Sequence, residues 1–123
     1  VEANMLTEGA VDRDGGVLDY CRLHDITIPA WSPFQYGFFE GVFVGNNEKY
    51  PKLNDELNAL AEQYGTTPTA IAAAWVLRHP AHIQLVAGTT SQARMREIIR
   101  GSEITLTREE WYRLYLAAGH ILP

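Results

Sequence analysis

The sequence predicts an α/β protein in which short parallel strands alternate with helices. Two runs rich in β-forming or apolar residues, 26–31 and 83–86, lie between segments whose apolar residues recur at helical spacing. A weaker alternation at residues 1–6 precedes the first helical segment. Because strands separated by helices usually pair in parallel, this order indicates βα units. We expect about three parallel strands with covering helices.

The N-terminal part reads as strand, loop, helix and strand. Residues 7–16 are polar and contain a Gly-Gly pair, which predicts a loop, and residues 17–24 predict a short helix. Pro29 argues against a central position for the strand at 26–31 unless it lies at a bulge.

Residues 32–50 predict a long loop that contains three glycines and several aromatic side chains. The aromatic residues are Phe34, Tyr36, Phe38, Phe39 and Phe43. Exposure of so much aromatic surface is costly, so we expect this loop to pack on or cover another part of the protein.

Two helices are predicted next, each with clear end signals. Pro51 is typical of a first helical position, and Gly65 of the residue after a helix. Thr67-Pro68 provides an N-cap and a first helical residue for the second helix, which Pro80 ends.

The last two helices follow the strand at 83–86. Ser91 is a candidate N-cap, and Gly101 is the expected terminator of that helix. Its expected buried residues are Met95, Ile98 and Ile99. Residues 107–110 form a capping box for the final helix.

Composition narrows the class of protein. The chain of 123 residues fits a single segment, 1–123, and 46% hydrophobic residues suffice for a core. A net charge of −5 argues against nucleic-acid binding, and no apolar run approaches the roughly 18 residues that cross a membrane. The single cysteine, Cys21, excludes an internal disulfide, so we expect a reducing, cytoplasmic location.

The expected sheet is incomplete. Three parallel strands leave both edges open, and a closed βα barrel needs roughly 250 residues. The chain also begins at Val1 within the pattern. We therefore expect a piece of a longer polypeptide, or copies that pair with each other through their open sheet edges.

Residues 83–98 hold the most informative motif: an apolar strand, a Gly-Thr-Thr-Ser turn and the start of a helix. A helix N-terminus presents unpaired N–H groups and a partial positive charge, which suit an anion such as phosphate. Arg94 adds a cation in the first helical turn. An ordinary strand-to-helix turn that binds nothing is the alternative.

The other polar residues do not suggest a reaction centre. His24 and His79 lie at predicted helix C-termini, where a positive charge is favourable, and the spacing of Cys and His residues does not match a zinc site. We expect no metal site. Asn4 lies near the C-terminal end of the first predicted strand and is a weak candidate for a contact with substrate.

Three segments carry a resemblance to a known family. Residues 29–34, 69–80 and 86–91, with Arg94 and Glu97 after them, occur in an order that resembles the C-terminal half of the aldo-keto reductases. Residues 108–111 add a likeness to a bacterial branch. These proteins are NADPH-dependent reductases on a (β/α)8 barrel, so the resemblance implies the C-terminal portion of such a barrel.

The resemblance also implies a set of cofactor-binding residues. Trp31 takes the place of the aromatic residue that packs on the nicotinamide ring. The segment after Trp31 takes the place of the residues that contact the pyrophosphate. The residues implied in that segment are Ser32, Phe34 and Tyr36. The segment for the adenosine 2′-phosphate contains Gly88, Thr89, Thr90 and Ser91. Arg94 matches the arginine that stacks on adenine, and Glu97 lies where the family contacts the adenine edge.

Two departures from the family pattern affect the cofactor. Gly88 stands where many members have Lys, and Ile98 where many have Asn. NADPH is the implied cofactor, and the loss of a cation at position 88 leaves NADH possible.

The family's proton-relay residues, an Asp, a Tyr, a Lys and a His, come from the first half of the barrel, so no catalytic residue is assigned to this chain. The resemblance implies an NAD(P)H-dependent reductase of small carbonyl substrates, with this segment inactive alone. Its expected partner is the N-terminal half of the barrel or another copy of itself. The alternative is a non-catalytic folding fragment that self-associates.

Overall fold

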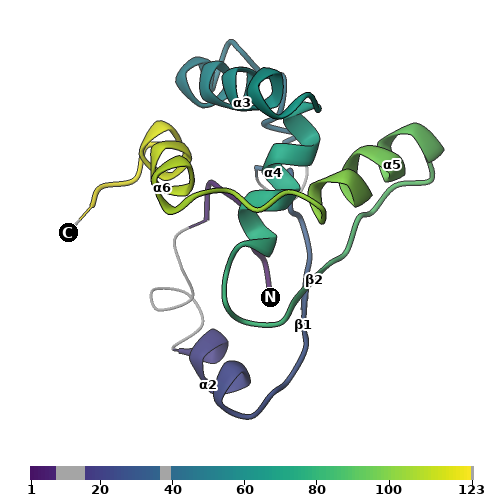
Figure 1. Cartoon of the computed structure of the whole chain (residues 1–123), viewed down its shortest axis with the longest axis vertical. Helices are drawn as coiled ribbons and strands as arrows, with labels where there is room; N and C mark the ends of the chain where they lie inside the picture. Colours follow the sequence, from purple (N-terminus) through teal and green to yellow (C-terminus); the bar gives the residue numbers. More distant parts are fainter. Residues whose placement is uncertain (8–15, 37–39, 123) are drawn as a thin grey trace.

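The structure is a computed structural model that describes residues 1–7, 16–36 and 40–122. Its elements, in order, are α2 (Val17–Leu23), β1 (Ile28–Ala30), α3 (Pro51–Tyr64), α4 (Pro68–Leu77), β2 (Ile83–Leu85), α5 (Gln92–Gly101) and α6 (Arg108–Ala117) (Figure 1). The predicted α/β class is confirmed. None of the helices in this described part of the chain has the length and apolarity to span a bilayer.

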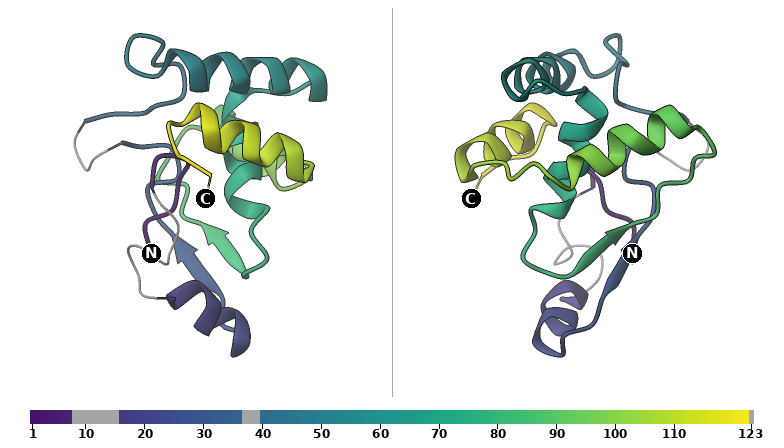
Figure 2. Two further views of the ribbon diagram at one scale, coloured as in Figure 1. Left: turned by 90° about the vertical axis from the view of Figure 1, so that its left-hand side faces the viewer. Right: turned by 45° about the vertical axis from the view of Figure 1, so that its right-hand side comes forward.

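The sheet holds two parallel strands, seen as adjacent arrows in Figure 2. In its register, Ile28 lies opposite Ile83 and Ala30 opposite Leu85. The third strand expected at residues 1–6 is therefore wrong as a full strand: it is reduced to one parallel bridge between Glu2 and Trp31.

A turn at Asn4 explains why the first strand is so short. The side-chain oxygen of Asn4 accepts hydrogen bonds from the N–H groups of Leu6 and Thr7, at 2.8 and 3.1 Å. An asparagine side chain that bonds the backbone two or three residues ahead stabilises a turn in place of an extended strand.

Pro29 lies inside β1 without disturbing its pairing to β2. The hydrogen bonds to β2 are made by the flanking residues, with the Ile28 N–H donating to His82 and Ala30 accepting from Val86. The carbonyl of Pro29 points the other way and accepts from the N-terminal amine of Val1 at 3.0 Å. The N–H that proline lacks would lie on that same side, so no hydrogen bond between β1 and β2 is lost.

Most of the predicted helix ends after β1 are confirmed; the end of α5 is the exception. Helix α3 begins at Pro51, and Gly65 follows it with a left-handed φ of 62°. The Thr67 side chain caps α4, and Thr107 with Glu110 forms the capping box of α6. These ends depend on local backbone chemistry, which is why the sequence defines them well.

Helix α4 is the centre of the core. Figure 1 shows it between α3, α5 and α6, and it also packs on β2. Its residues 70–76 are all buried, so it is covered on every side. The indole N–H of Trp75 donates to the Trp111 carbonyl and that of Trp111 to the Trp75 carbonyl, both at 3.0 Å, which joins α4 to α6.

Helix α5 departs from two expectations. Gly101 is the last helical residue and is buried, and Ser102 is the cap, so Gly101 does not act as the terminator. A Cβ at Gly101 would lie 2.6 Å from the Ala70 carbonyl oxygen, so glycine is needed for the close approach of α5 to α4. Of the expected buried stripe, Ile98 is buried, whereas Met95 and Ile99 are 36% and 56% exposed.

The aromatic loop after β1 folds back on itself. Gln35 and Val42 form an antiparallel bridge, and the Phe43 N–H donates to the Phe34 carbonyl at 3.0 Å. Phe34 and Phe43 are buried, which confirms that the loop packs on the rest of the protein. Phe38 and Phe39 lie outside the described residues, as do residues 8–15 of the first predicted loop.

Candidate functional site

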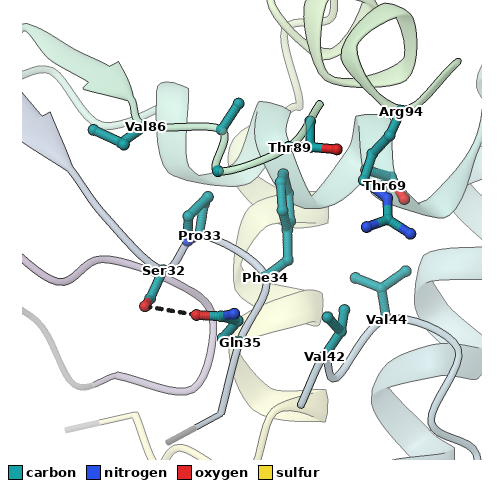
Figure 3. Close-up of a pocket in the computed structure, with 12 residues that line it drawn as sticks. Ser32, Pro33, Phe34, Gln35, Val42, Val44, Thr69, Val86, Thr89 and Arg94 are labelled. Carbon is teal, nitrogen blue, oxygen red and sulfur yellow. Dashed lines mark hydrogen bonds between the residues drawn. The ribbon is translucent and has the colours of Figure 1, made fainter. Parts of the chain in front are cut away.

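A cavity of about 250 Å³ opens between the segments that follow the two strands. One side is formed by residues 32–35 after β1, and the other by residues 86–89 after β2 (Figure 3). Val42 and Val44 from the folded-back loop, Thr69 from α4 and Arg94 from α5 complete it. The carboxyl ends of parallel strands are where α/β proteins usually place ligand sites.

Arg94 provides the positive charge of this cavity. Its side chain extends from the first turn of α5, and its guanidinium lies beside Thr69 and Val44 (Figure 3). Among the described residues, no carboxylate lies within ion-pair distance of it. A guanidinium without a carboxylate partner keeps its N–H groups available to an anion.

The N-terminus of α5 lies beside the same cavity. The Ser91 hydroxyl oxygen accepts from the Arg94 N–H at 3.3 Å, and the Thr89 hydroxyl oxygen accepts from the Ser91 N–H at 3.1 Å. Ser91 is thus confirmed as the N-cap. The hydroxyl hydrogens of both residues remain able to donate, and the first turn adds the positive end of a ten-residue helix.

Two backbone conformations shape the cavity edges. Gly88 has a φ of 60°, and a Cβ added there would meet nothing within 4 Å. Ser32 has a φ of 54°, which is unfavourable for a residue with a side chain. Its hydroxyl donates to the Gln35 side-chain oxygen at 3.0 Å, and its carbonyl accepts from Asn4 at 2.9 Å.

The structure brings together half of the residues that the resemblance implied for the cofactor. Those that line the cavity are Ser32, Phe34, Gly88, Thr89 and Arg94. Those that do not are Trp31, Tyr36, Thr90, Ser91 and Glu97. Trp31 is 42% exposed at the end of β1, and Thr90 and Ser91 are exposed at the start of α5. The roles of all ten in cofactor binding stay predictions.

Tyr36 contacts its own loop in place of the cavity. Its hydroxyl oxygen accepts from the Asn46 side chain at 3.2 Å, and its ring packs edge-on against Tyr50. The Lys49 ammonium lies 4.3 Å from the centre of the same ring. These contacts give Tyr36 a structural role in holding the loop together.

Seven lining residues were not predicted as site residues, and they are Pro33, Gln35, Val42, Val44, Thr69, Val86 and Ala87. Thr69 lies in the first turn of α4, and its hydroxyl group lies near the Arg94 guanidinium (Figure 3). Only the packing of α4 on α5 brings Thr69 next to Arg94, and no local pattern in the sequence reports that packing.

Asn4 and the histidines are engaged in structural contacts. The amide of Asn4 donates to the carbonyls of Ser32 and Gln35 and accepts from two backbone N–H groups, so its hydrogen-bonding capacity serves the fold and not a substrate. His79 Nδ1 accepts from the Ala81 N–H, and burial, which outweighs the nearby Asp19 carboxylate, lowers its pKa. No group of three metal-ligating side chains occurs within the described ranges.

The comparisons with known proteins agree on one family. The model of the aldo/keto reductase family matches residues 1–116. A 6-dehydroglucose reductase of Agrobacterium fabrum is 34% identical over 104 residues, which cover 84% of this chain and 33% of that protein. A 6-dehydroglucose reductase of Novosphingobium aromaticivorans is 30% identical over 111 residues, which cover 89% of this chain and 36% of that protein.

A solved structure shows the same fold. It is the crystal structure of a thermostable aldo-keto reductase, Tm1743, in complex with the inhibitor epalrestat. It matches 95% of this chain and 38% of its own chain, with a TM-score of 0.68 and 23% sequence identity. The present chain thus spans about a third of the length of the curated relatives that it matches.

Proposed function

Because the chain belongs to the aldo/keto reductase family, we propose that it forms the cofactor-binding C-terminal part of an NAD(P)H-dependent enzyme that reduces a carbonyl group. The cavity between residues 32–35 and 86–89 is the observation that supports this most directly. It combines a guanidinium that has no carboxylate partner among the described residues, hydroxyl groups and a helix N-terminus, which together suit a phosphate.

The residues of the cavity fit one phosphate-bearing end of the cofactor. A volume of about 250 Å³ is below the roughly 300 to 1,000 Å³ of sites that enclose a whole drug-sized ligand. The donor set of Thr69, Thr89 and Arg94 matches phosphate oxygens in chemistry. In our proposal, Arg94 and residues 88–91 hold the adenosine end, with Glu97 at the adenine edge.

The pyrophosphate and nicotinamide parts of the cofactor are assigned to the residues after β1. Ser32, Phe34 and Tyr36 belong to the proposed pyrophosphate segment, and Trp31 at the end of β1 provides the proposed aromatic face for the nicotinamide ring. The bound cofactor would supply a hydride to the carbonyl carbon of a small substrate. The chain's own residues bind and orient the cofactor, and we assign no proton donor among them.

The choice between NADPH and NADH depends on Arg94 in this proposal. Gly88 offers no cation, so a 2′-phosphate is bound by the Arg94 guanidinium, the Thr89 hydroxyl and the N–H groups of α5. NADPH is the proposed cofactor, with NADH as a weaker ligand. A cytoplasmic location is part of the proposal, since the sequence has one cysteine.

A titration of the full gene product that contains this chain tests the proposal. NADPH is added while tryptophan fluorescence is recorded, and we expect saturable quenching with a Kd in the micromolar range or below. NADH titrated in the same way is expected to bind more weakly. Absence of binding by either nucleotide at high micromolar concentration would overturn the proposed function.

We further propose a partner for the open edge of β2. The N–H and C=O groups of Gln84 face β1, so those of Leu85 face away from it, and Leu85 and Ile99 line the same groove. The N-terminal half of the barrel or a second copy of the chain would provide the missing strand. In this proposal the chain is inactive alone, because the family's proton relay is contributed by that other half.

A further inference from the structure

Two buried asparagines hold the segment that walls the candidate cavity. This wall segment comprises the described residues 32–36 and 40–46. We propose that Asn4 and Asn54 are positioning residues that set the affinity of the cavity for a phosphate-bearing nucleotide. The inference rests on the proposed function, since it takes the cavity to be part of the cofactor site.

The wall segment has two arms, residues 32–36 and residues 40–46, and Asn54 holds the second arm. It lies in the first turn of α3 and is 1% exposed. Its side-chain nitrogen donates to the carbonyls of Phe43, Asn46 and Tyr50 at 2.9, 3.1 and 2.9 Å. Its side-chain oxygen accepts from the Gly45 N–H at 2.6 Å. One amide group therefore fixes both ends of an eight-residue turn, sharing two N–H donors among three carbonyls.

The residues next to this anchor face the cavity. Phe43, whose carbonyl Asn54 holds, is fully buried in the core, while Val42 and Val44 on either side of it line the cavity. Figure 3 shows Val44 beside the Arg94 guanidinium. A shift of the Phe43 carbonyl would move Val42 and Val44 relative to Arg94.

Asn4 holds the first arm in the same way. It is 2% exposed, and its side-chain nitrogen donates to the carbonyls of Ser32 and Gln35 at 2.9 and 3.0 Å. Those two residues bracket the part of the wall segment that lines the cavity after β1. Ser32 also has the left-handed φ of 54°, so the Asn4 contact stabilises a conformation that is otherwise unfavourable.

The two arms are joined, so the asparagines act on one structure. The Phe43 N–H donates to the Phe34 carbonyl at 3.0 Å, and Gln35 bridges to Val42. Both anchors come from outside the wall segment, one from the N-terminal turn and one from α3. Displacement of either arm is therefore expected to change the shape of the cavity without removing any group that contacts the nucleotide.

The test replaces each asparagine by aspartate in the full gene product. Asn54→Asp and Asn4→Asp keep the acceptor oxygen but lose the N–H donors and put a carboxylate against backbone carbonyl oxygens. Asn58→Asp is the matched control, because Asn58 is exposed on the same helix, α3. We expect the Kd for NADPH to rise about tenfold in N54D and N4D and to stay within about twofold in N58D.

The Kd and the number of binding sites separate positioning from unfolding. A variant that is partly unfolded has fewer sites with an unchanged intrinsic Kd, so calorimetric titration reports both quantities. Asn54→Ser and Asn4→Ser lose the same amide donors without a buried charge and are expected to raise the Kd if the aspartate variants do not fold.

Wild-type Kd values in all four variants, at full site number, would overturn this inference while leaving the proposed function intact. Failure of the wild-type protein to bind NADPH at all would overturn both.

Discussion

Arg94 extends from the first turn of α5 into the cavity, where hydroxyl groups but no carboxylate surround it among the described residues. Glu110 shows the opposite situation for a charged side chain. It is 8% exposed, accepts from the Tyr64 hydroxyl at 2.6 Å and from Gln63 at 3.0 Å, and caps α6 through the Thr107 N–H. The charge of Arg94 is available for a ligand, whereas that of Glu110 is committed to the fold.

Removal of the Arg94 guanidinium is expected to weaken NADPH binding more than NADH binding. A hydrogen-bonded charge is typically worth about 1.5–3 kcal/mol, so Arg94→Ala should raise the Kd for NADPH about tenfold or more. Arg96→Ala is the control, because Arg96 is exposed on the same helix and does not line the cavity. Equal losses of NADPH and NADH affinity would contradict the assignment of Arg94 to the 2′-phosphate.

Glu110 is expected to make stability dependent on pH in the acid range. Burial alone would raise the pKa of Glu110, but the hydrogen bonds from Tyr64, Thr107 and Gln63 outweigh it and lower the pKa below the ordinary 4.5. The same hydrogen bond, with burial and the carboxylate charge, raises the pKa of Tyr64. Because the folded state holds Glu110 ionised, its contribution is present above pH 4.5 and is lost as the pH falls through the lowered pKa.

Glu110→Gln tests this directly. At neutral pH the substitution should lower the free energy of unfolding by about 1–2 kcal/mol, because charge-assisted hydrogen bonds become neutral ones. The difference from wild type should shrink as the pH falls below 4.5. Chemical denaturation between pH 3 and pH 7, roughly the range over which carboxylates titrate, measures it. Glu109→Gln, at an exposed neighbouring position, should show no such convergence.

At the scale of elements, α4 determines where the other helices lie. It is buried along residues 70–76 and contacts α3, α5 and β2. Its junction with α6 is the Trp75–Trp111 stack, whose ring centres lie 4.4 Å apart. Its junction with α5 is the glycine contact at Gly101. Because α5 carries Arg94 and α4 carries Thr69, this second junction also sets the geometry of the cavity.

Gly101→Ala is therefore expected to destabilise the protein, although alanine normally favours a helix over glycine. The added Cβ would lie 2.6 Å from the Ala70 carbonyl oxygen and 2.7 Å from the Ala73 Cβ, so α5 must move away from α4. We expect a loss of about 1–3 kcal/mol in the free energy of unfolding, measured by chemical denaturation. Arg96→Ala, at an exposed position of the same helix, is the control. A stability gain in G101A would show that the helices separate at no cost.

At the scale of the whole molecule, no described strand pairs with β2 on the side away from β1, so the sheet is open there in the described part of the chain. A groove of about 610 Å³ runs beside β2 and α5, and its lining includes Leu85, Met95 and Ile99. On the other side, the only pairing of β1 with described residues is the short one with residues 1–3. Parallel sheets are normally covered on both faces, so this architecture needs a further strand and helix layer to be closed.

The 123-residue chain is expected to self-associate through this groove when it is studied alone. Sedimentation velocity at increasing concentration should show species larger than the monomer. Ile99→Lys places a charge in the groove and should favour the monomer, because Ile99 is 56% exposed and contributes little to the core. Leu116→Lys, on α6 away from the groove, is the control at 47% exposure. A compact monomer at all concentrations would argue against edge pairing.

Much of the element plan could be predicted because local chemistry encodes it. Thr67, Ser91 and Thr107 cap helices through their own side chains, and Gly65 ends α3 in a left-handed conformation. The close contact of Gly101 and the long-range contact of Asn4 could not be assigned in this way. Their roles are defined by Ala70 of another helix and by Ser32, 28 positions along the chain.

The sequence by itself determined the α/β class, most of the helix ends and, through three ordered segments, the resemblance to the aldo-keto reductases. It also identified five of the residues that line the cavity. The tertiary structure decided which polar groups meet there: Thr69 joins Arg94 through the packing of α4 on α5, while Tyr36 faces its own loop. The physical reason is the distance along the chain over which each kind of interaction acts. Capping and periodicity act over a few residues, whereas the cavity depends on close contacts between elements that are distant in the chain.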